Sequence, residues 1–146
     1  MSGVERDKHR IKQTAEVFTP TSLVQEMLDK LEEQDPTLFS DPTKTFLDNS
    51  CGDCQFLSEV IIRKMEKNGC DLLMALSTTY GVDLMLDNII ECRRRIAGPN
   101  PTPEIVKIIE TNIVCADSLK YDYSFKKKRG SARKKLKGHD RQMKLF

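Results

Sequence analysis

The stretch that decides the fold is Thr45-Phe-Leu-Asp48-Asn-Ser-Cys-Gly52-Asp53-Cys54-Gln-Phe56-Leu57. Its first four residues have the pattern of a short buried strand, and residues 49–53 have the composition of a turn. From residue 54 to 68 apolar side chains recur at helical spacing, and Gly69 then ends the helix. A turn that contains glycine and leads into a helix brings backbone N–H groups to a ligand. The stretch therefore predicts a ligand site at the turn, although an ordinary strand-to-helix connection has the same pattern.

The alternation of strand and helix continues along the chain. Strands are expected over residues 45–48, 78–84 and 112–116. Helices are expected over residues 22–34, 54–68, 85–97 and 103–110, with Thr21 or Ser22 capping the first, and a helical turn over 72–76. Such alternation predicts a parallel sheet with right-handed crossovers. The expected fold class is α/β, a partial doubly wound, Rossmann-like sheet with flanking helices.

Composition indicates one globular domain. The 146 residues are 38% apolar and 32% charged. No apolar run approaches the roughly 18 residues that cross a membrane, and the first 13 residues lack the apolar core of a signal peptide. We therefore expect a cytoplasmic protein without membrane contact, whose five cysteines are reduced thiols. Three regions are expected: a flexible N-terminus (1–15), a folded domain (16–123) and a basic, disordered tail (124–146).

An acidic residue follows or closes each expected strand. Asp48 ends the first, Asp83 ends the second after Tyr80-Gly-Val, and Asp117 follows the third. Ligands of open α/β sheets bind at the carboxyl ends of the strands, where an acid after the second strand accepts hydrogen bonds from ribose hydroxyls. The alternative for Asp83 is the N-cap of the next helix, and one side chain can serve both purposes.

These turns, together with Val17-Phe18-Thr19-Pro20, resemble a known family. The chain is similar to the N-terminal, cofactor-binding half of the S-adenosylmethionine-dependent adenine-N6 DNA methyltransferases of restriction–modification systems. The resemblance covers roughly residues 16–123. It rests on Phe18-Thr-Pro-Thr-Ser-Leu-Val24, on residues 48–56, on Gly81-Val-Asp83 with Asn88-Ile-Ile-Glu-Cys92-Arg93, and on Asn112-Ile-Val-Cys-Ala-Asp117.

The resemblance implies a class I methyltransferase fold with S-adenosylmethionine as the cofactor. Asp48 and Gly52 would contact the methionine part, Asp83 the ribose hydroxyls and Asp117 the adenine amino group. Phe18 and Thr19 would lie against the cofactor from outside. Asp83 has the clearest physical basis, because an ionised carboxylate accepts hydrogen bonds from both hydroxyls.

One departure from the family pattern concerns cysteine. Cys54 stands where the family often has a second glycine, and Cys51-Gly-Asp-Cys54 spells Cys-x-x-Cys. A zinc site would need two more ligands, and the sequence has no second Cys-x-x-Cys pair. A redox pair is a further alternative, and two small buried thiols are the plainest interpretation.

A second departure is the missing catalytic motif, an Asn or Asp followed by Pro-Pro and an aromatic residue. The prolines are residues 20, 36, 42, 99, 101 and 103, and no two are adjacent. We therefore assign no catalytic residue, leave open whether the chain is an enzyme, and do not expect it to transfer methyl groups alone. Catalysis on another substrate through unrecognised groups is an alternative.

The strand that would follow the third in such a sheet is also missing. Without it, Phe46 and Leu47 would form an apolar sheet edge. We expect a second copy, the C-terminal tail or a catalytic partner chain to cover this edge; a persisting gene fragment is the alternative.

The C-terminal part differs sharply in charge. Residues 125–146 hold ten Lys or Arg and one acid, whereas residues 1–124 hold 14 basic and 21 acidic residues. Such a tail attracts DNA phosphates without reading sequence. The candidates for this contact are Lys126, Lys127, Lys128, Arg129, Arg133, Lys134 and Lys135. A solvated chain end is the alternative.

The last five residues, Gln142-Met-Lys-Leu145-Phe146, resemble the peptide by which replication and repair proteins bind a bacterial-type sliding clamp. Gln142, Leu145 and Phe146 would make that contact. The sequence thus supports two functions: an incomplete, partner-dependent methyltransferase, or a non-enzymatic protein that associates with DNA or a sliding clamp.

Overall fold

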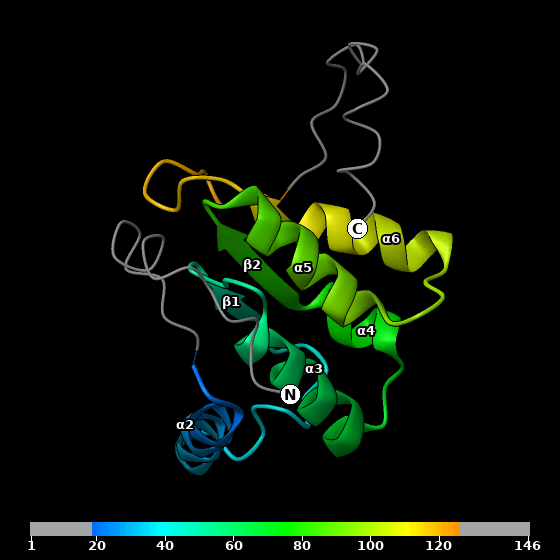
Figure 1. Ribbon diagram of the computed structural model, residues 1–146. Coiled ribbons are helices and arrows are strands. Elements are labelled where there is room, and N and C mark those ends of the chain that lie inside the picture. Colours follow the sequence, from blue (N-terminus) through cyan, green and yellow to red (C-terminus); the bar gives the residue numbers. More distant parts are fainter. Residues whose placement is uncertain (1–18, 126–146) are drawn as a thin grey trace, which may run out of the picture.

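A computed structural model describes residues 19–125 as an α/β domain (Figure 1). In chain order its elements are α2 (Thr21–Gln34), β1 (Phe46–Asp48), α3 (Gln55–Asn68), α4 (Leu72–Ser77), β2 (Thr79–Asp83), α5 (Leu86–Ala97), α6 (Pro103–Asn112) and β3 (Ile113–Cys115). The three strands form one parallel sheet in the order β1-β2-β3, flanked by helices. The expected α/β class and parallel sheet are confirmed.

Strand pairing assigns side chains to the two faces of the sheet. Leu47 pairs with Tyr80, and Val82 pairs with Val114. Because side chains alternate along a strand and paired residues share a face, these four side chains lie on one face. Their immediate neighbours in sequence, among them Gly81, lie on the other.

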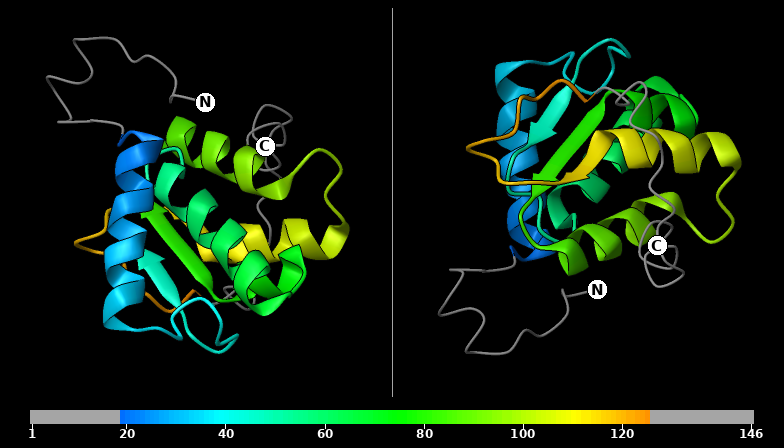
Figure 2. Two further views of the ribbon diagram at one scale, coloured as in Figure 1. Left: turned by 90° about the horizontal axis from the view of Figure 1, so that it is seen from below. Right: turned by 90° about the horizontal axis from the view of Figure 1, so that it is seen from above.

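Helices α3 and α5 cover the face that Gly81 shares, and α2 packs beside α3 (Figure 2, left). The main core lies between these helices, α4, α6 and the sheet, and includes Leu57, Ile61, Leu76, Ile89, Cys92, Ile96, Ile109 and Ile113. A second cluster joins α2 to α3 and consists of Val24, Leu28, Phe39 and Val60. Burying one such large apolar side chain contributes about 1.5–3 kcal/mol, so α2 is held mainly by this cluster.

The segment after β3 returns to the sheet on the opposite face (Figure 2, right), and its aromatic rings pack together with Tyr80 of β2. The ring centroid of Phe125 lies 4.7 Å from that of Tyr80, and Tyr121 lies 5.3 Å from both Tyr123 and Phe125. The Tyr123 hydroxyl donates a 2.6 Å hydrogen bond to the carbonyl of Ser118. The rings of Tyr80, Tyr121, Tyr123 and Phe125 are called the aromatic cluster below. They cover part of the sheet face that α3 and α5 do not cover.

The observed elements agree with the expected ones to within two residues at each end. Two details of the expectation are wrong. The N-cap of α2 is Pro20, without a side-chain cap, and Thr21 is already helical. The first strand is not fully buried, because Leu47 is 51% exposed where β1 pairs, among the described strands, with β2 alone. Between residues 19 and 125, no helix is both long enough and apolar enough to cross a membrane.

Candidate functional site

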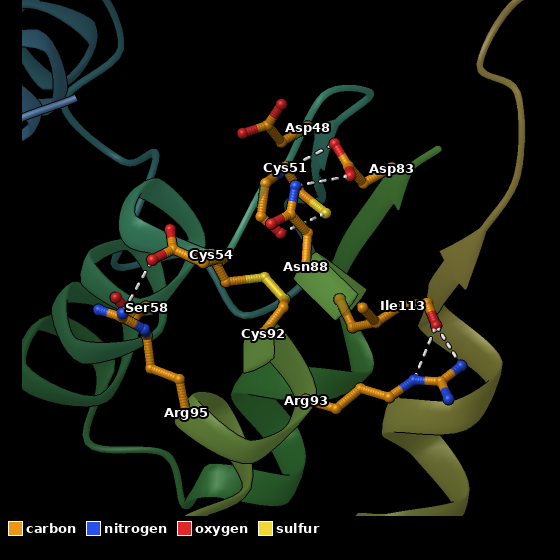
Figure 3. The surroundings of a disulfide bond; sticks show 12 residues. Asp48, Cys51, Cys54, Ser58, Asp83, Asn88, Cys92, Arg93, Arg95 and Ile113 are labelled. Carbon is orange, nitrogen blue, oxygen red and sulfur yellow. Dashed lines mark hydrogen bonds and ion pairs between the residues drawn. A yellow bond between two sulfur atoms is a disulfide. The ribbon is translucent and has the colours of Figure 1, made fainter. Parts of the chain in front are cut away.

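Two carboxylates stand at the carboxyl ends of neighbouring parallel strands. Asp48 is the last residue of β1 and Asp83 the last of β2, and the pairing of Asp48 with Gly81 brings the two ends together. Figure 3 shows both side chains beside the turn that contains Cys51. The sheet therefore places together the two acids that the sequence singled out separately.

The turn between β1 and α3 is fastened to β2. The backbone N–H of Cys51 donates to the carbonyl of Val82 at 3.0 Å, and that of Gly52 donates to the Asp83 carboxylate at 3.3 Å. Gly52 has a φ of 53°, which glycine adopts without the steric penalty of a side chain. A backbone donor of the turn and the carboxylate of the next strand thus already face each other.

Asp83 also organises the start of α5. Its second oxygen accepts from the backbone N–H of Met85 at 3.0 Å and from the side-chain amide of Asn88 at 3.1 Å. The N-cap position itself belongs to Met85, so the N-cap alternative for Asp83 is wrong in its strict form. A carboxylate offers about four lone-pair positions, so the three bonds described here leave capacity for a ligand hydroxyl.

Asp48 accepts fewer of the described hydrogen bonds than Asp83. The Asp48 carboxylate accepts a 3.0 Å bond from the backbone N–H of Ser50. Burial raises the pKa of Asp48, and the negative charge of Asp83 adds to this, although the Ser50 bond opposes it. The pair consequently favours a ligand that brings hydrogen-bond donors or positive charge, because either relieves the repulsion between the acids.

The other expected cofactor residues lie on other segments of the chain. Asp117 follows β3, which is anchored where Ala116 N–H donates to the Asp83 carbonyl at 3.0 Å, but its own carboxylate accepts from Leu119 N–H at 3.0 Å. Thr19 precedes α2, whose first residue Thr21 accepts a 3.5 Å bond from the Gln55 amide at the start of α3. Phe18 lies outside the described residues.

The cysteines differ from expectation. Cys54 and Cys92 form a disulfide that links the turn to α5, so the expectation that all five cysteines are reduced is wrong (Figure 3). The two residues are 38 positions apart, and no local sequence pattern predicts that they pair. Cys54 itself has a φ of 66°, where a side chain costs about 1–2 kcal/mol and glycine costs little.

Cys51 is a buried free thiol beside this disulfide. Burial raises its pKa far above the ordinary value, and the charges of Asp48 and Asp83 raise it further. Its sulfur and those of Cys54 and Cys92 all lie within 4.8 Å of one another. The Cys-x-x-Cys segment thus has a third sulfur close by, which the sequence analysis did not find.

Two arginines of α5 also fasten the site. Arg95 donates to the buried carboxylate of Asp53 at 3.0 Å and to the Gln55 side chain at 3.2 Å. Arg93 donates to the carbonyl of Ile113 at 2.7 Å (Figure 3). Sequence reasoning placed Arg93 in a motif without this role and missed Arg95. The alternation of charged and apolar residues in α5 is equally typical of a solvated helix face.

The remaining sequence expectations lie outside the described residues. They are the nucleic-acid candidates Lys126, Lys127, Lys128, Arg129, Arg133, Lys134 and Lys135, and the clamp-binding candidates Gln142, Leu145 and Phe146.

Comparison with known proteins identifies no relative. No family model matches the chain, and no curated protein or solved structure matches it significantly.

Proposed function

We propose that the chain binds S-adenosylmethionine at the carboxyl ends of its strands, as the cofactor-binding half of an adenine-N6 DNA methyltransferase. The observation that carries this proposal is the 3.3 Å bond from Gly52 N–H to the Asp83 carboxylate, which joins the glycine turn to the next strand. In doubly wound folds the glycine turn contacts the cofactor, and an acid at the end of the next strand binds the ribose. We infer that the three-stranded sheet is part of such a fold.

The charges at the site suit this ligand. The ribose of S-adenosylmethionine offers two hydroxyl donors, and Asp83 would accept one of them through its remaining lone-pair position and the other in place of the Asn88 amide. Its ammonium and sulfonium groups are cationic and would neutralise Asp48. Burial and the negative charge of Asp83 raise the pKa of Asp48, so a nearby positive charge would be favourable there. Asp117 would accept from the adenine amino group after its bond to Leu119 N–H opens.

Methyl transfer, in this proposal, needs groups from a partner chain. The sequence contains no Pro-Pro-aromatic motif to hold and orient a target adenine. Among the described strands β1 has one neighbour, and Leu47 on it is 51% exposed. In a doubly wound sheet a further strand pairs at that side of β1. A partner that supplies the strand and the motif would both cover the edge and complete the site.

The cofactor claim is tested by calorimetric titration of the full chain with S-adenosylmethionine, comparing the wild type with Asp83→Asn. Hydrogen bonds to a charged group contribute about 1.5–3 kcal/mol. The variant should therefore bind roughly 10–100-fold more weakly. Asp41→Asn is the matched control, because Asp41 also accepts a backbone hydrogen bond but lies in an exposed loop.

A second pair of ligands isolates the ribose contact. Adenosine should bind the wild type more tightly than 2′,3′-dideoxyadenosine, and Asp83→Asn should bind both equally. A folded wild type that binds no S-adenosylmethionine would refute the proposal. Equal loss of both nucleosides in the variant would refute the ribose role alone.

Catalysis has its own test. The chain alone should transfer no radiolabelled methyl group to adenine-containing DNA, whereas addition of a chain that carries a Pro-Pro-aromatic motif and binds at β1 should restore transfer. Transfer by the chain alone would show that the catalytic groups are already present.

A second candidate function is non-enzymatic association with nucleic acid, favoured by the ten basic residues among positions 125–146. Binding would be independent of sequence and would weaken steeply with salt. Replacing Lys126, Lys127 and Lys128 with Gln should lower the salt slope by roughly one unit for each phosphate that is no longer neutralised. Clamp association is tested separately by pull-down with the wild type and with Phe146→Ala.

A further inference from the structure

Three sulfur atoms converge beneath the turn between β1 and α3. Cys51 and Cys54 come from the turn and Cys92 from the middle of α5, and their sulfurs lie within 4.8 Å of one another (Figure 3). All three residues are buried, with exposed fractions of 5%, 0% and 0%. The other two cysteines of the chain, Cys70 and Cys115, are not part of this group.

The backbone around the group accommodates these sulfurs at some cost. Cys54 keeps a side chain at a φ of 66°, where glycine would be free of strain. On β2, a Cβ at Gly81 would lie 3.1 Å from the Cys51 sulfur, so the absence of a side chain there leaves room for it. Strained or specially shaped backbone of this kind is typical of functional sites.

A disulfide accounts for only two of the three sulfurs. Cys51 has no role in the Cys54–Cys92 bond, yet its sulfur lies beside both. The carboxylates of Asp48 and Asp83 are close enough for their charge to act on the Cys51 thiol. Converging sulfurs in a negatively charged environment are suited to a thiophilic cation.

We propose that, in the reduced protein, Cys51, Cys54 and Cys92 bind one thiophilic divalent cation, of which Zn²⁺ is the best fit. Zn–S bonds of about 2.3 Å at tetrahedral angles require sulfurs about 3.8 Å apart, within the present spread of the group. Three cysteines fill three of the four preferred positions and leave one for water. This site goes beyond the proposed cofactor binding and stands without it.

The disulfide and the metal exclude each other. A thiol reductant opens the bond with two electrons: the disulfide and two reductant thiols give Cys54–SH, Cys92–SH and one reductant disulfide. Zn²⁺ and three thiols then give a zinc tris-thiolate with one negative charge and release three protons. A small-molecule disulfide reverses this: it oxidises Cys54 and Cys92, is itself reduced to two thiols, and with uptake of three protons releases Zn²⁺ and the Cys51 thiol. The same sulfurs therefore either hold an ion or tie the turn to α5.

The test is titration of the reduced, metal-free full chain with Co²⁺, followed by displacement with Zn²⁺. One Co²⁺ should bind per chain and give the near-ultraviolet absorption of cobalt–thiolate bonds, and the oxidised chain should give none. Cys51→Ser should weaken binding more than about 100-fold, since even changes outside the ligand set cost 10–100-fold.

Cys51→Ser is the decisive variant because it leaves Cys54 and Cys92 able to form their disulfide, so its folding can be verified in the oxidised state. Cys70→Ser and Cys115→Ser are matched controls and should bind Co²⁺ as the wild type does. The proposal is overturned if the reduced wild type binds no Co²⁺. It is equally overturned if Cys51→Ser binds unchanged or if the controls lose binding to the same extent.

Discussion

At the scale of single residues, space around the backbone decides what the turn can hold. Gly81 faces the core from the middle of β2, and an added Cβ would lie 2.8 Å from a methyl of Leu57 and 3.1 Å from the Cys51 sulfur. Gly69 and Gly98 differ, since positive φ rather than crowding favours glycine there. Gly81 is therefore a packing requirement of the site and not a turn residue.

Gly81→Ala should destabilise the chain by about 1–3 kcal/mol, because a methyl group is forced into a filled core. The measurement is urea unfolding of both proteins. In a Leu57→Val background, which shortens the side chain that meets the new methyl, the cost of Gly81→Ala should be clearly smaller. An equal cost in both backgrounds would show that crowding by Leu57 is not the cause.

The sequence predicts residues of the site unevenly. Asp48 and Asp83 stand out because a strand and a turn flank each of them, and those are local patterns. The pairing of Cys54 with Cys92 depends on how α5 lies against the turn, and a local pattern does not reveal a contact between residues 38 positions apart. The left-handed backbone at Cys54 could not be predicted either, because a cysteine side chain does not indicate a positive φ.

At the scale of elements, α3 carries a buried cation. Lys64 is 3% exposed, and its ammonium group donates to the hydroxyl of Thr78 at 2.7 Å and to that of Thr79 at 2.9 Å. It also lies 5.4 Å from the ring centroid of Phe46. Burial lowers the pKa of Lys64 to about 8 from an ordinary 10.5. The bonds tie α3 to the start of β2 while the charge opposes burial.

The stability of the chain should therefore depend on pH through Lys64. Between pH 8 and 10.5 the unfolded chain holds a proton that the folded chain has lost, so the free energy of unfolding rises with pH across this window. Below pH 8 both states are protonated and the full cost of the buried charge is present. The gain should be on the order of 1–3 kcal/mol and absent in Lys64→Met.

Chemical unfolding at pH 7.5 and pH 10 measures this dependence, taken as the difference between each variant and the wild type so that other titrations cancel. Lys67→Met is the matched control, because Lys67 lies on the same helix but is half exposed beside Glu32. If Lys64→Met gains as much stability between the two pH values as the wild type does, the titration of Lys64 is not the cause of the pH dependence.

Elements were the most predictable level of this molecule. Helical periodicity and the Gly69 and Gly98 stops define α3 and α5 locally, and the observed bounds follow them. Burial inside an element was not predictable. Lys64 lies three positions after Ile61, on the apolar face of α3, but lysine is rarely buried, and its residue type therefore predicts exposure. Phe39 lies in a loop whose proline and threonine content suggests exposure, yet it is 1% exposed.

At the scale of the whole molecule, the Cys54–Cys92 disulfide closes a long loop. It joins residues 38 apart and encloses all of α3, α4 and β2, and half of α5. Restricting the unfolded chain over about 39 residues stabilises the folded state by about 4 kcal/mol on entropic grounds. Of the described elements, α2, β1, α6 and β3 lie outside this loop.

Reduction in the presence of a metal chelator should lower the free energy of unfolding by about that amount, 3–4 kcal/mol. Urea unfolding with and without the reductant measures the loss. Cys92→Ala should unfold identically in both conditions, and Cys70→Ser should lose as much as the wild type. If the urea midpoint of the wild type is the same with and without the reductant, the disulfide adds no net stability.

The aromatic cluster also determines what the intrinsic fluorescence of the molecule can report. The chain has no tryptophan, and its three tyrosines are Tyr80, Tyr121 and Tyr123, all in that cluster. Intrinsic fluorescence therefore reports on one face of the sheet only. A ligand bound at Asp48 and Asp83, on the helix-covered side, will leave tyrosine emission unchanged unless it also moves the rings. A change in emission on ligand addition would therefore show that binding on one face of the sheet alters the other face.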